Sequence, residues 1–250
     1  MIVLAAGRGG RLGLPTPKVL LRLGGRALLE RHRSAFRRMG FARQIWVLGH
    51  RAAEVRAALG ADRDTFEVVL NPQYVSSGSG YSLYLAACHA PPGSLVFMDA
   101  DLLYDSRIFE DARGAGNRLL YTARERLDEE AVKVYAYNGR LHGLRKDTLT
   151  GHKPLGESVG IVALDAAGAS ALRDTLGDTV RRRGTAFEWE EAVETLAERI
   201  PIQLAPTSAP WIEIDFEEDL ECAERLAAER IPPDRGAFDR GPFDRGLTSK

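Results

Sequence analysis

The residues between Ile2 and Lys18 combine an apolar run, a glycine-rich loop and three cationic side chains. The run from Ile2 to Ala6 is typical of a buried strand, and the loop behind it carries Arg8 and Arg11, with Lys18 following. Glycines let backbone N–H groups approach a phosphate closely, and fixed cations nearby neutralise its charge. This pattern predicts a binding site for a nucleoside triphosphate.

Two better-known glycine loops do not fit this stretch. The dinucleotide fingerprint G-x-G-x-x-G would begin at Gly7 and Gly9, but Leu12 stands where its third glycine is required. The P-loop needs a Gly-Lys pair followed by serine or threonine, whereas Lys18 follows Pro17. A flexible turn with solvated arginines is the simpler alternative, and the buried strand ahead of the loop argues against it.

A second set of chemically capable residues consists of aspartates placed where apolar strands end. Asp99 and Asp101 follow one such strand, and Asp215 follows another. Mg²⁺ keeps most of its waters and takes one or two protein carboxylates together with phosphate oxygens. We therefore predict that Asp101 and Asp215 bind Mg²⁺, with Asp99 beside them as an orienting or alternate ligand. The alternative for Asp215 is that it caps the helix that follows.

The second half of the chain holds the candidates for binding a second, small substrate. They are Lys133, Glu157, Ser158, Glu188, Trp189 and Glu190. Lys133 either reaches a phosphate or is a solvated lysine on an edge strand. Acids at a helix start favour its dipole, but a tryptophan among them is better explained by charge pairing and cation–π contact with an ammonium group.

The predicted elements explain how these groups come together. Strands are expected at 2–6, 44–48, 66–70, 94–98, 118–122, 159–164 and 211–214, and helices at 26–39, 52–59, 81–90, 107–113, 166–176, 188–199 and 217–230. A hairpin is expected at 132–144, because its Asn-Gly pair suits a type I′ turn. We predict an α/β fold with a Rossmann-like, doubly wound, mostly parallel sheet, helices on both faces and a small antiparallel insertion.

Composition sets limits on the function. With 250 residues, 44% hydrophobic and 28% charged, the chain suits one domain. We expect it to cover 1–230, with nucleotide binding mainly in 1–125 and acceptor binding mainly in 126–215. The net charge of −1 argues against a nucleic-acid or membrane partner. Cys88 and Cys222 are interpreted as buried thiols of a cytoplasmic protein. The repetitive stretch 231–250 is expected to be a disordered tail.

The stretch Leu4-Ala5-Ala6-Gly7-x-Gly9-x-Arg11-Leu12, followed by Pro17-Lys18, resembles the signature of nucleotidyltransferases that activate sugar phosphates and phospho-alcohols. Asn71-Pro-x-Tyr and the residues up to Leu85 resemble the loop that phosphocholine cytidylyltransferases place against the base. The resemblance implies a nucleotide-diphospho-sugar transferase-like fold, with Lys18 and Arg11 as catalytic residues. The implied nucleotide contacts are Leu4, Ala5, Ala6, Gly7, Arg8, Gly9, Gly10, Asn71, Ser77, Gly78, Ser79, Ser82 and Asp99. Ser77 and Ser79 have a structural alternative as caps of the next helix.

The resemblance implies a Mg²⁺-dependent cytidylyltransferase. It would couple CTP to a small phosphonate or phospho-alcohol, such as 2-aminoethylphosphonate, 2-hydroxyethylphosphonate or phosphocholine, and release pyrophosphate. A sugar-1-phosphate nucleotidyltransferase using UTP or dTTP is the alternative enzyme, and a catalytically silent nucleotide sensor is an alternative of another class. The sequence leaves open the base, the amine or hydroxyl on the acceptor, and the oligomeric state.

Overall fold

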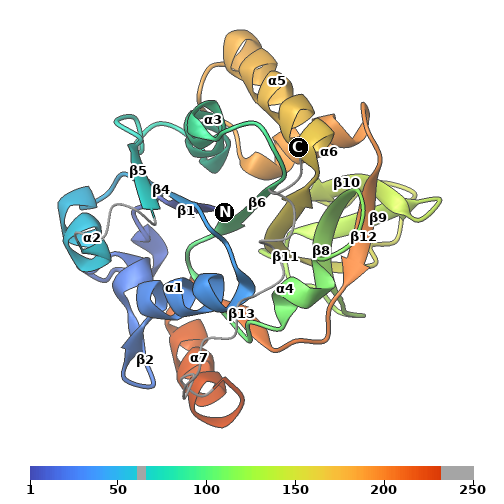
Figure 1. Cartoon of the computed structure of the whole chain (residues 1–250). Coiled ribbons are helices and arrows are strands. Elements are labelled where there is room, and N and C mark those ends of the chain that lie inside the picture. The colour runs from blue at the N-terminus through green and yellow to red at the C-terminus, as the bar shows by residue number, and fades with distance from the viewer. Residues whose placement is uncertain (61–65, 232–250) are drawn as a thin grey trace.

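A nine-stranded sheet forms the centre of the molecule in the computed structural model, which describes residues 1–60 and 66–231 (Figure 1). Its strands, in spatial order, are β5 (Phe66–Leu70), β4 (Gln44–Leu48), β1 (Ile2–Ala5), β6 (Leu95–Asp99), β11 (Gly156–Leu164), β8 (Asn117–Ala123), β12 (Ile202–Pro206), β10 (Arg140–Arg145) and β9 (Lys133–Tyr137).

The sheet is mixed. The four strands from β5 to β6 run parallel, which confirms the predicted doubly wound half. β11 then runs antiparallel to both β6 and β8, and the expected hairpin of β9 and β10 closes the far side. The antiparallel part is therefore larger than the small insertion that the sequence predicts, because β11 lies in the middle of the sheet rather than in the hairpin.

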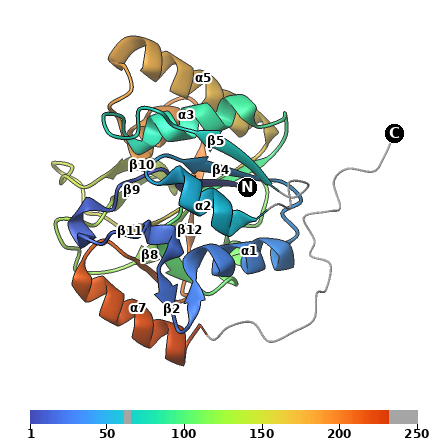
Figure 2. The ribbon, with the colours of Figure 1, turned by 90° about the vertical axis from the view of Figure 1, so that its left-hand side faces the viewer.

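Helices cover both faces of this sheet (Figure 2). One face packs against α1 (Leu28–Met39), α2 (Ala52–Leu59) and α4 (Ile108–Asp111), and the other against α3 (Ser79–His89), α5 (Ala166–Arg183) and α6 (Trp189–Ala197). β1 shows why two cores form, since Ile2 and Leu4 enter one cluster and Val3 the other. Successive side chains of a strand point to opposite faces.

α1 illustrates how the sequence determines a helix. Its buried residues recur at helical spacing, and Gly40 ends it with a φ of 75°, a conformation that suits glycine. The helix begins at Leu28 rather than at the predicted 26, because Arg26–Ala27 forms β3 against β2 (Arg22–Leu23). His32 is 1% exposed, and its two ring nitrogens lie 2.9 Å from the Tyr104 hydroxyl and the Ala100 carbonyl, as expected for a structural residue.

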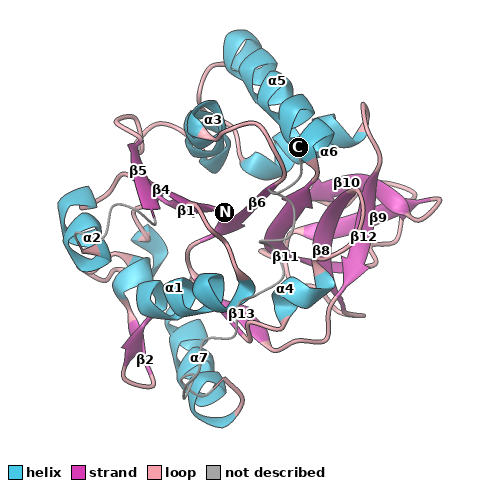
Figure 3. Ribbon diagram, in the orientation of Figure 1, coloured by secondary structure: helices cyan, strands magenta, loops and turns pink. Residues whose placement is uncertain are grey.

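A third, smaller cluster joins the end of the described chain to its beginning. α7 (Glu217–Glu229) packs near β2 (Figure 3). The short strands β13 (Trp211–Glu213) and β7 (Leu102–Tyr104) pair antiparallel and contribute to the same cluster. Ile231, the first residue of the predicted tail, is 8% exposed and packs in this cluster. The remainder of that predicted tail, 232–250, lies outside the described residues.

The cysteines differ from their prediction. Cys88 on α3 and Cys222 on α7 are both free and exposed, so they are not buried thiols. Each occupies a solvent-facing position of an amphipathic helix, which the sequence pattern alone did not distinguish from a core position. Within the ranges 1–60 and 66–231, no helix is long and apolar enough to cross a membrane.

Candidate active site

The carboxyl ends of β1 and β6 border a cavity of about 290 Å³ that also reaches the start of α3. It is lined by Leu4, Ala5, Ala6, Gly7, Gly9, Pro17, Lys18, Val19, Asn71, Tyr74, Ser77, Gly78, Ser79, Ser82, Asp99, Ala100, Asp101 and Glu188. All of the predicted nucleotide contacts except Arg8 and Gly10 are in this lining. The structure therefore brings together the opening loop, the 71–82 segment and the strand-end aspartates.

The opening loop contains two 3₁₀ turns, Gly10–Leu12 and Lys18–Leu20. Gly9 has a φ of 60°, and a Cβ there would lie 3.0 Å from the Cγ of Lys18. Glycine at this position therefore allows the lysine side chain to lie across the loop. A Cβ at Gly7 or Gly10 would meet nothing within 4 Å, so the loop has open space at those two positions.

Lys18 lies between two of the predicted metal ligands. Its ammonium is 3.0 Å from Oδ2 of Asp101 and donates a second, shorter hydrogen bond to Oδ1 of Asp215. Burial alone would lower the pKa of Lys18, but the two carboxylates outweigh burial and raise it. Burial alone would raise the pKa of Asp215, but the hydrogen bond and the charge of Lys18 outweigh burial and lower it. Lys18 therefore stays protonated and acts as their counter-ion.

Asp215 does not cap the helix that follows it. The N-cap position of α7 is Phe216, and the Asp219 carboxylate accepts hydrogen bonds from the backbone N–H groups of Asp215, at 2.9 Å, and Phe216, at 2.8 Å. Asp219 thus satisfies the helix start. The alternative of a capping role for Asp215 is wrong, and its side chain is left to contact Lys18 and Arg11.

A third carboxylate joins the two predicted ones. Oxygens from Asp101, Glu213 and Asp215 all lie within 4.8 Å of one another, and this oxygen-only set suits a hard divalent cation. Glu213 stands two residues before Asp215 in an extended segment and so shares its face, although no motif in the sequence marks it. Glu213 is exposed to solvent, and the protein around its carboxyl, followed by the charges of Asp101 and Asp215, shifts its pKa upward.

Asp99 and Trp189 form a second acidic corner. The indole N–H of Trp189 donates to Oδ2 of Asp99 at 3.0 Å. Trp189 is 2% exposed and packs edge-on against Phe97, so its ring is not open to an ammonium group as predicted. Burial, followed by the charge of Asp101, raises the pKa of Asp99 well above its usual value. Burial is also the main cause that raises the pKa of Glu190 to about 7.

The serines at the start of α3 do not cap it. The N-cap is Gly78, and the Ser79 hydroxyl donates to Glu188 at 2.5 Å and accepts from the Trp189 N–H at 2.9 Å. Asn71 donates to the hydroxyls of Ser77, at 2.9 Å, and Ser82, at 3.0 Å. These bonds connect the 71–82 segment to α6, so this wall of the cavity is held in place from both sides.

Three predicted acceptor contacts are engaged elsewhere. Lys133 is 9% exposed and its ammonium donates to backbone carbonyls, so it is neither a solvated edge lysine nor directed to the cavity. Glu157 pairs with Arg124 at 2.6 Å, and Ser158 is 6% exposed with its hydroxyl accepting from the Gly160 N–H. Lys133 and Ser158 are buried and Glu157 is partly buried, because β11 lies inside the sheet and β9 pairs with it.

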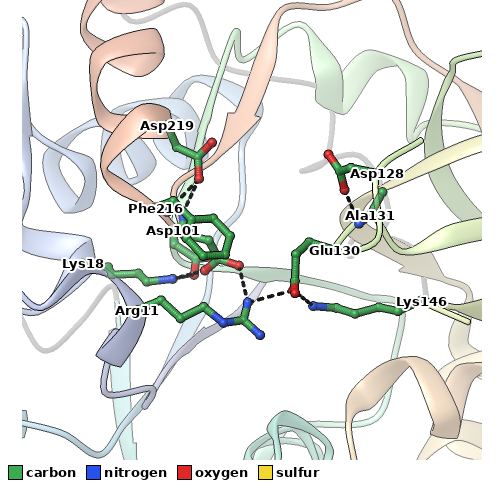
Figure 4. A network of polar contacts seen from close by, with 10 residues as sticks. Arg11, Lys18, Asp101, Asp128, Glu130, Ala131, Lys146, Phe216 and Asp219 are labelled. Carbon is green, nitrogen blue, oxygen red and sulfur yellow. Dashed lines mark hydrogen bonds and ion pairs between the residues drawn. The ribbon is translucent and has the colours of Figure 1, made fainter. Parts of the chain in front are cut away.

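Two charged residues beside the site, Glu130 and Lys146, had no signal in the sequence. Arg11 contacts both Asp215 and Glu130 at 3.1 Å, and Glu130 in turn contacts Lys146 at 2.8 Å. Figure 4 shows this chain of charges running from Lys18 to Lys146. Arg11 also lies over the Phe216 ring at 5.6 Å, which holds its guanidinium beside the carboxylates. Glu130 and Lys146 come from the segment 126–215, so this chain of charges connects that segment to the opening loop.

The opening loop, Asp99, Asp101 and the cavity lining apart from Glu188 lie in the part of the chain that matches a known family, and Asp215 lies beyond it. Residues 1–174 match the model of the MobA-like NTP transferase domain. The chain belongs to this family. The family match covers the loop, the 71–82 segment, Asp99 and Asp101, and it establishes the chain as a nucleotidyltransferase, as the sequence predicts.

Curated relatives of this MobA-like transferase include bifunctional proteins named GlmU. The one from Rippkaea orientalis (strain PCC 8801 / RF-1) is 32% identical over 100 residues, which cover 40% of this chain and 22% of that protein. The one from Acidovorax ebreus (strain TPSY) is 35% identical over 133 residues, which cover 50% and 28% of the two chains. The alignments thus span only about a quarter of these relatives.

Solved structures extend the similarity to nearly the whole chain. The inositol-1-phosphate CTP transferase from T. maritima has a TM-score of 0.73 at 20% identity, over 91% of this chain and 96% of that one. CTP:phosphocholine cytidylyltransferase from Streptococcus pneumoniae has 0.74 at 21%, over 90% and 97%. UDP-glucose pyrophosphorylase from Acinetobacter baumanii has 0.71 at 15%, over 92% and 93%. The expected nucleotide-diphospho-sugar transferase-like fold is confirmed.

Proposed function

We propose that this nucleotidyltransferase transfers a cytidylyl group from CTP to a small phosphonate or phospho-alcohol. An oxygen of the acceptor attacks the α-phosphorus, the bond between the α-phosphorus and the bridging oxygen breaks, and pyrophosphate leaves. Such a transfer depends on positioning and charge neutralisation and needs no protein nucleophile. The fold similarity to the inositol-1-phosphate CTP transferase and to CTP:phosphocholine cytidylyltransferase supports this choice of nucleotide.

The observation that carries the proposal is a group of carboxylates at and beside one end of the cavity. Asp99 and Asp101 line the cavity, and carboxylate oxygens of Glu213 and Asp215 lie within 4.8 Å of one of Asp101. Lys18 pairs with Asp101 and Asp215, and Glu213 and Asp99 add further acids beside that pair. A site of this kind favours ligands that bring positive charge. A divalent cation and an acceptor with a cationic end, such as 2-aminoethylphosphonate or phosphocholine, both do so.

The residues that would hold Mg²⁺ are Asp101, Glu213 and Asp215, whose hard oxygen donors suit that ion. When bound, Mg²⁺ neutralises the repulsion between the nucleotide phosphates and the incoming acid. Glu213 is our addition to the pair that the sequence predicts. Asp99, which the Trp189 indole N–H orients, lies beside these three carboxylates and would contact the cationic end of the acceptor.

The remaining roles follow from where the side chains lie. Lys18, at the cavity wall, stabilises the charge that develops on the α-phosphate. Arg11 and the backbone amides from Gly7 to Gly10 hold the departing pyrophosphate. Asn71 and Ser82, fixed by their mutual hydrogen bond, contact the base or ribose. Each charged contact of this kind contributes about 3 kcal/mol to lowering the barrier.

A sugar-1-phosphate nucleotidyltransferase using UTP or dTTP is the second candidate. The curated relatives named GlmU and the UDP-glucose pyrophosphorylase structure favour it.

One experiment separates the candidates. Pyrophosphate release is measured for each of four NTPs with phosphocholine, the two small phosphonates and glucose-1-phosphate, all with Mg²⁺. We expect turnover with CTP and a cationic acceptor, and its loss in Asp101→Asn. Asp105→Asn is the matched control, because Asp105 pairs with Arg107 on the surface. Absence of turnover with CTP on every acceptor would overturn the proposal, and turnover of UTP or dTTP with glucose-1-phosphate would support the second candidate.

A further inference from the structure

One carboxylate oxygen bridges two cations beside the site. Oε2 of Glu130 lies 3.1 Å from Nη1 of Arg11 and 2.8 Å from Nζ of Lys146. Arg11 comes from the opening loop, Glu130 from the segment between β8 and β9, and Lys146 from the residue after β10. The three side chains thus meet from parts of the chain that are distant in sequence (Figure 4).

A buried lysine fixes this arrangement. The Lys133 ammonium donates to the carbonyl oxygens of Asp128 at 3.0 Å, Ala131 at 3.3 Å and Lys146 at 2.6 Å. The Asp128 carboxylate closes the same turn by accepting from the Ala131 N–H at 2.7 Å. One ammonium therefore ties the turn that carries Glu130 to the backbone of Lys146. Burying a charge is costly unless it is hydrogen-bonded, and Lys133 satisfies this condition with all three of its donors.

The bridging position suits a phosphate oxygen. A carboxylate oxygen between a guanidinium and an ammonium makes the contacts that a phosphate oxygen makes with the same two groups. Lys146 is the main cause and Arg11 a further cause of the lowered pKa of Glu130, so this carboxylate is ionised. The side chains of Arg11, Glu130 and Lys146 are 48%, 49% and 45% exposed, and ion pairs exposed to this degree contribute little stability. A multiply charged phosphate can therefore displace Glu130 at small cost.

The bridging oxygen of Glu130 also lies close to the carboxylates proposed to hold Mg²⁺. Arg11 contacts Asp215 with the same nitrogen that contacts Glu130. Lys146 contacts the Glu130 oxygen that this guanidinium also contacts, so it lies one residue away from Arg11 and two from Asp215 in the same chain of ion pairs.

We infer that Arg11 and Lys146 form a phosphate subsite in which the Glu130 carboxylate stands in for a phosphate oxygen. Lys146 is then a substrate-binding residue, and Lys133 is the residue that positions it. The inference rests on the proposed function insofar as the anion is a phosphate of one of its substrates or its product. Two sources have this chemistry, the pyrophosphate end of the nucleotide and the phosphonate of the acceptor.

The test measures binding by titration calorimetry, with pyrophosphate as the probe for the nucleotide end and methylphosphonate as the probe for the acceptor. We expect Lys146→Met to weaken the binding of one of these two anions about tenfold, because a hydrogen bond to a charged group is lost. Glu130→Gln should increase the affinity for the same anion several-fold, because the carboxylate charge that competes with the anion is removed. The anion affected identifies the source.

Matched controls remove the same charges from neighbouring residues. Arg145→Met removes a cation that pairs with Glu194 instead, and Glu129→Gln removes an acid from the same turn as Glu130. Both controls should bind the two anions as the wild type does. Unchanged affinities in Lys146→Met, or weaker anion binding in Glu130→Gln, would overturn the subsite.

Lys133 is tested by coupling. In a folded Lys133→Met background, the Glu130→Gln change should no longer tighten anion binding, because the turn no longer holds residue 130 beside Lys146. If Glu130→Gln still increases anion affinity to the same extent in this background, the positioning role of Lys133 is refuted. The Glu130 and Lys146 variants test the subsite itself, whether or not Lys133→Met folds. These measurements need no turnover, so a negative result in them is distinct from a failure of CTP in the transferase assay.

Discussion

Replacing Lys18 with methionine should change two properties of the protein in opposite directions. The ammonium lies between Asp101 and Asp215, whose side chains are 21% and 23% exposed. Carboxylate oxygens of these residues lie within 4.8 Å of each other, and at an effective dielectric of about 20 this separation gives a repulsion of about 3 kcal/mol. Lys18 offsets that repulsion, so Lys18→Met leaves the pair uncompensated.

Two consequences follow from this repulsion. Turnover should fall at least about a hundredfold, because the positive charge that faces the α-phosphate is lost. The affinity for Mn²⁺, measured by electron paramagnetic resonance without nucleotide, should rise at least about tenfold, because the cation now relieves the repulsion that Lys18 relieved before. The variant should also melt at a lower temperature in EDTA and recover when Mn²⁺ is added.

The opposite signs make the test decisive. A lysine with only a structural role would lower turnover and metal affinity together, since both would suffer from a distorted site. Arg107→Met is the control for loss of one positive charge, because its partner Asp105 lies away from the carboxylate group. Mn²⁺ binding that is unchanged or weaker in Lys18→Met, or near-normal turnover, would refute the reasoning.

Three further predictions concern the metal group, the cavity wall and the core. Glu213→Gln should weaken Mn²⁺ binding about tenfold, whereas Glu217→Gln, on the first turn of α7, should not; equal affinities would exclude Glu213 as a ligand. Gly78→Ala should destabilise the fold by about 1–3 kcal/mol in urea unfolding, because its Cβ would lie 2.0 Å from the Phe187 carbonyl oxygen; a neutral result would contradict this contact. Burial lowers the pKa of His32 from 6.5 to about 4, so the unfolded chain takes up its proton first as the pH falls. Stability is therefore full above pH 6.5 and falls by about 3 kcal/mol towards pH 4, and His32→Phe should flatten that dependence in urea unfolding across this range.

Local sequence patterns predicted most of the elements in residues 1–125. The apolar alternation of β1 and the helical spacing in α1 are properties of short segments, and the structure has both elements close to the predicted bounds. The short strands β7 and β12 were missed, because three residues carry little periodicity and Pro206 at the end of β12 is atypical of a strand. The central place of β11 depends on pairings with strands far away in sequence.

The residues of the candidate site also fall into two groups, those that local motifs identify and those that only the fold brings together. Lys18 and Asp101 stand in recognisable motifs, and the structure brings them to one cavity. Glu157 also has a suggestive context, but its pairing with Arg124 depends on the register of β8 against β11, which no local pattern contains. Glu130 and Lys146 are exposed charges in ordinary surface sequence, and only the fold places them beside Arg11.

The long sequence separation between Lys18 and Asp215, 197 positions, has a consequence for how the enzyme is made. During translation the glycine loop and its lysine emerge first, and most of the sheet can form before β13 brings Glu213 and Asp215 into place. A nascent chain that stops ahead of β13 carries the loop and Asp101 but only part of the acidic group. The reactive arrangement is therefore completed late in synthesis, so incomplete chains that have folded their sheet do not yet hold the full set of residues for the transfer.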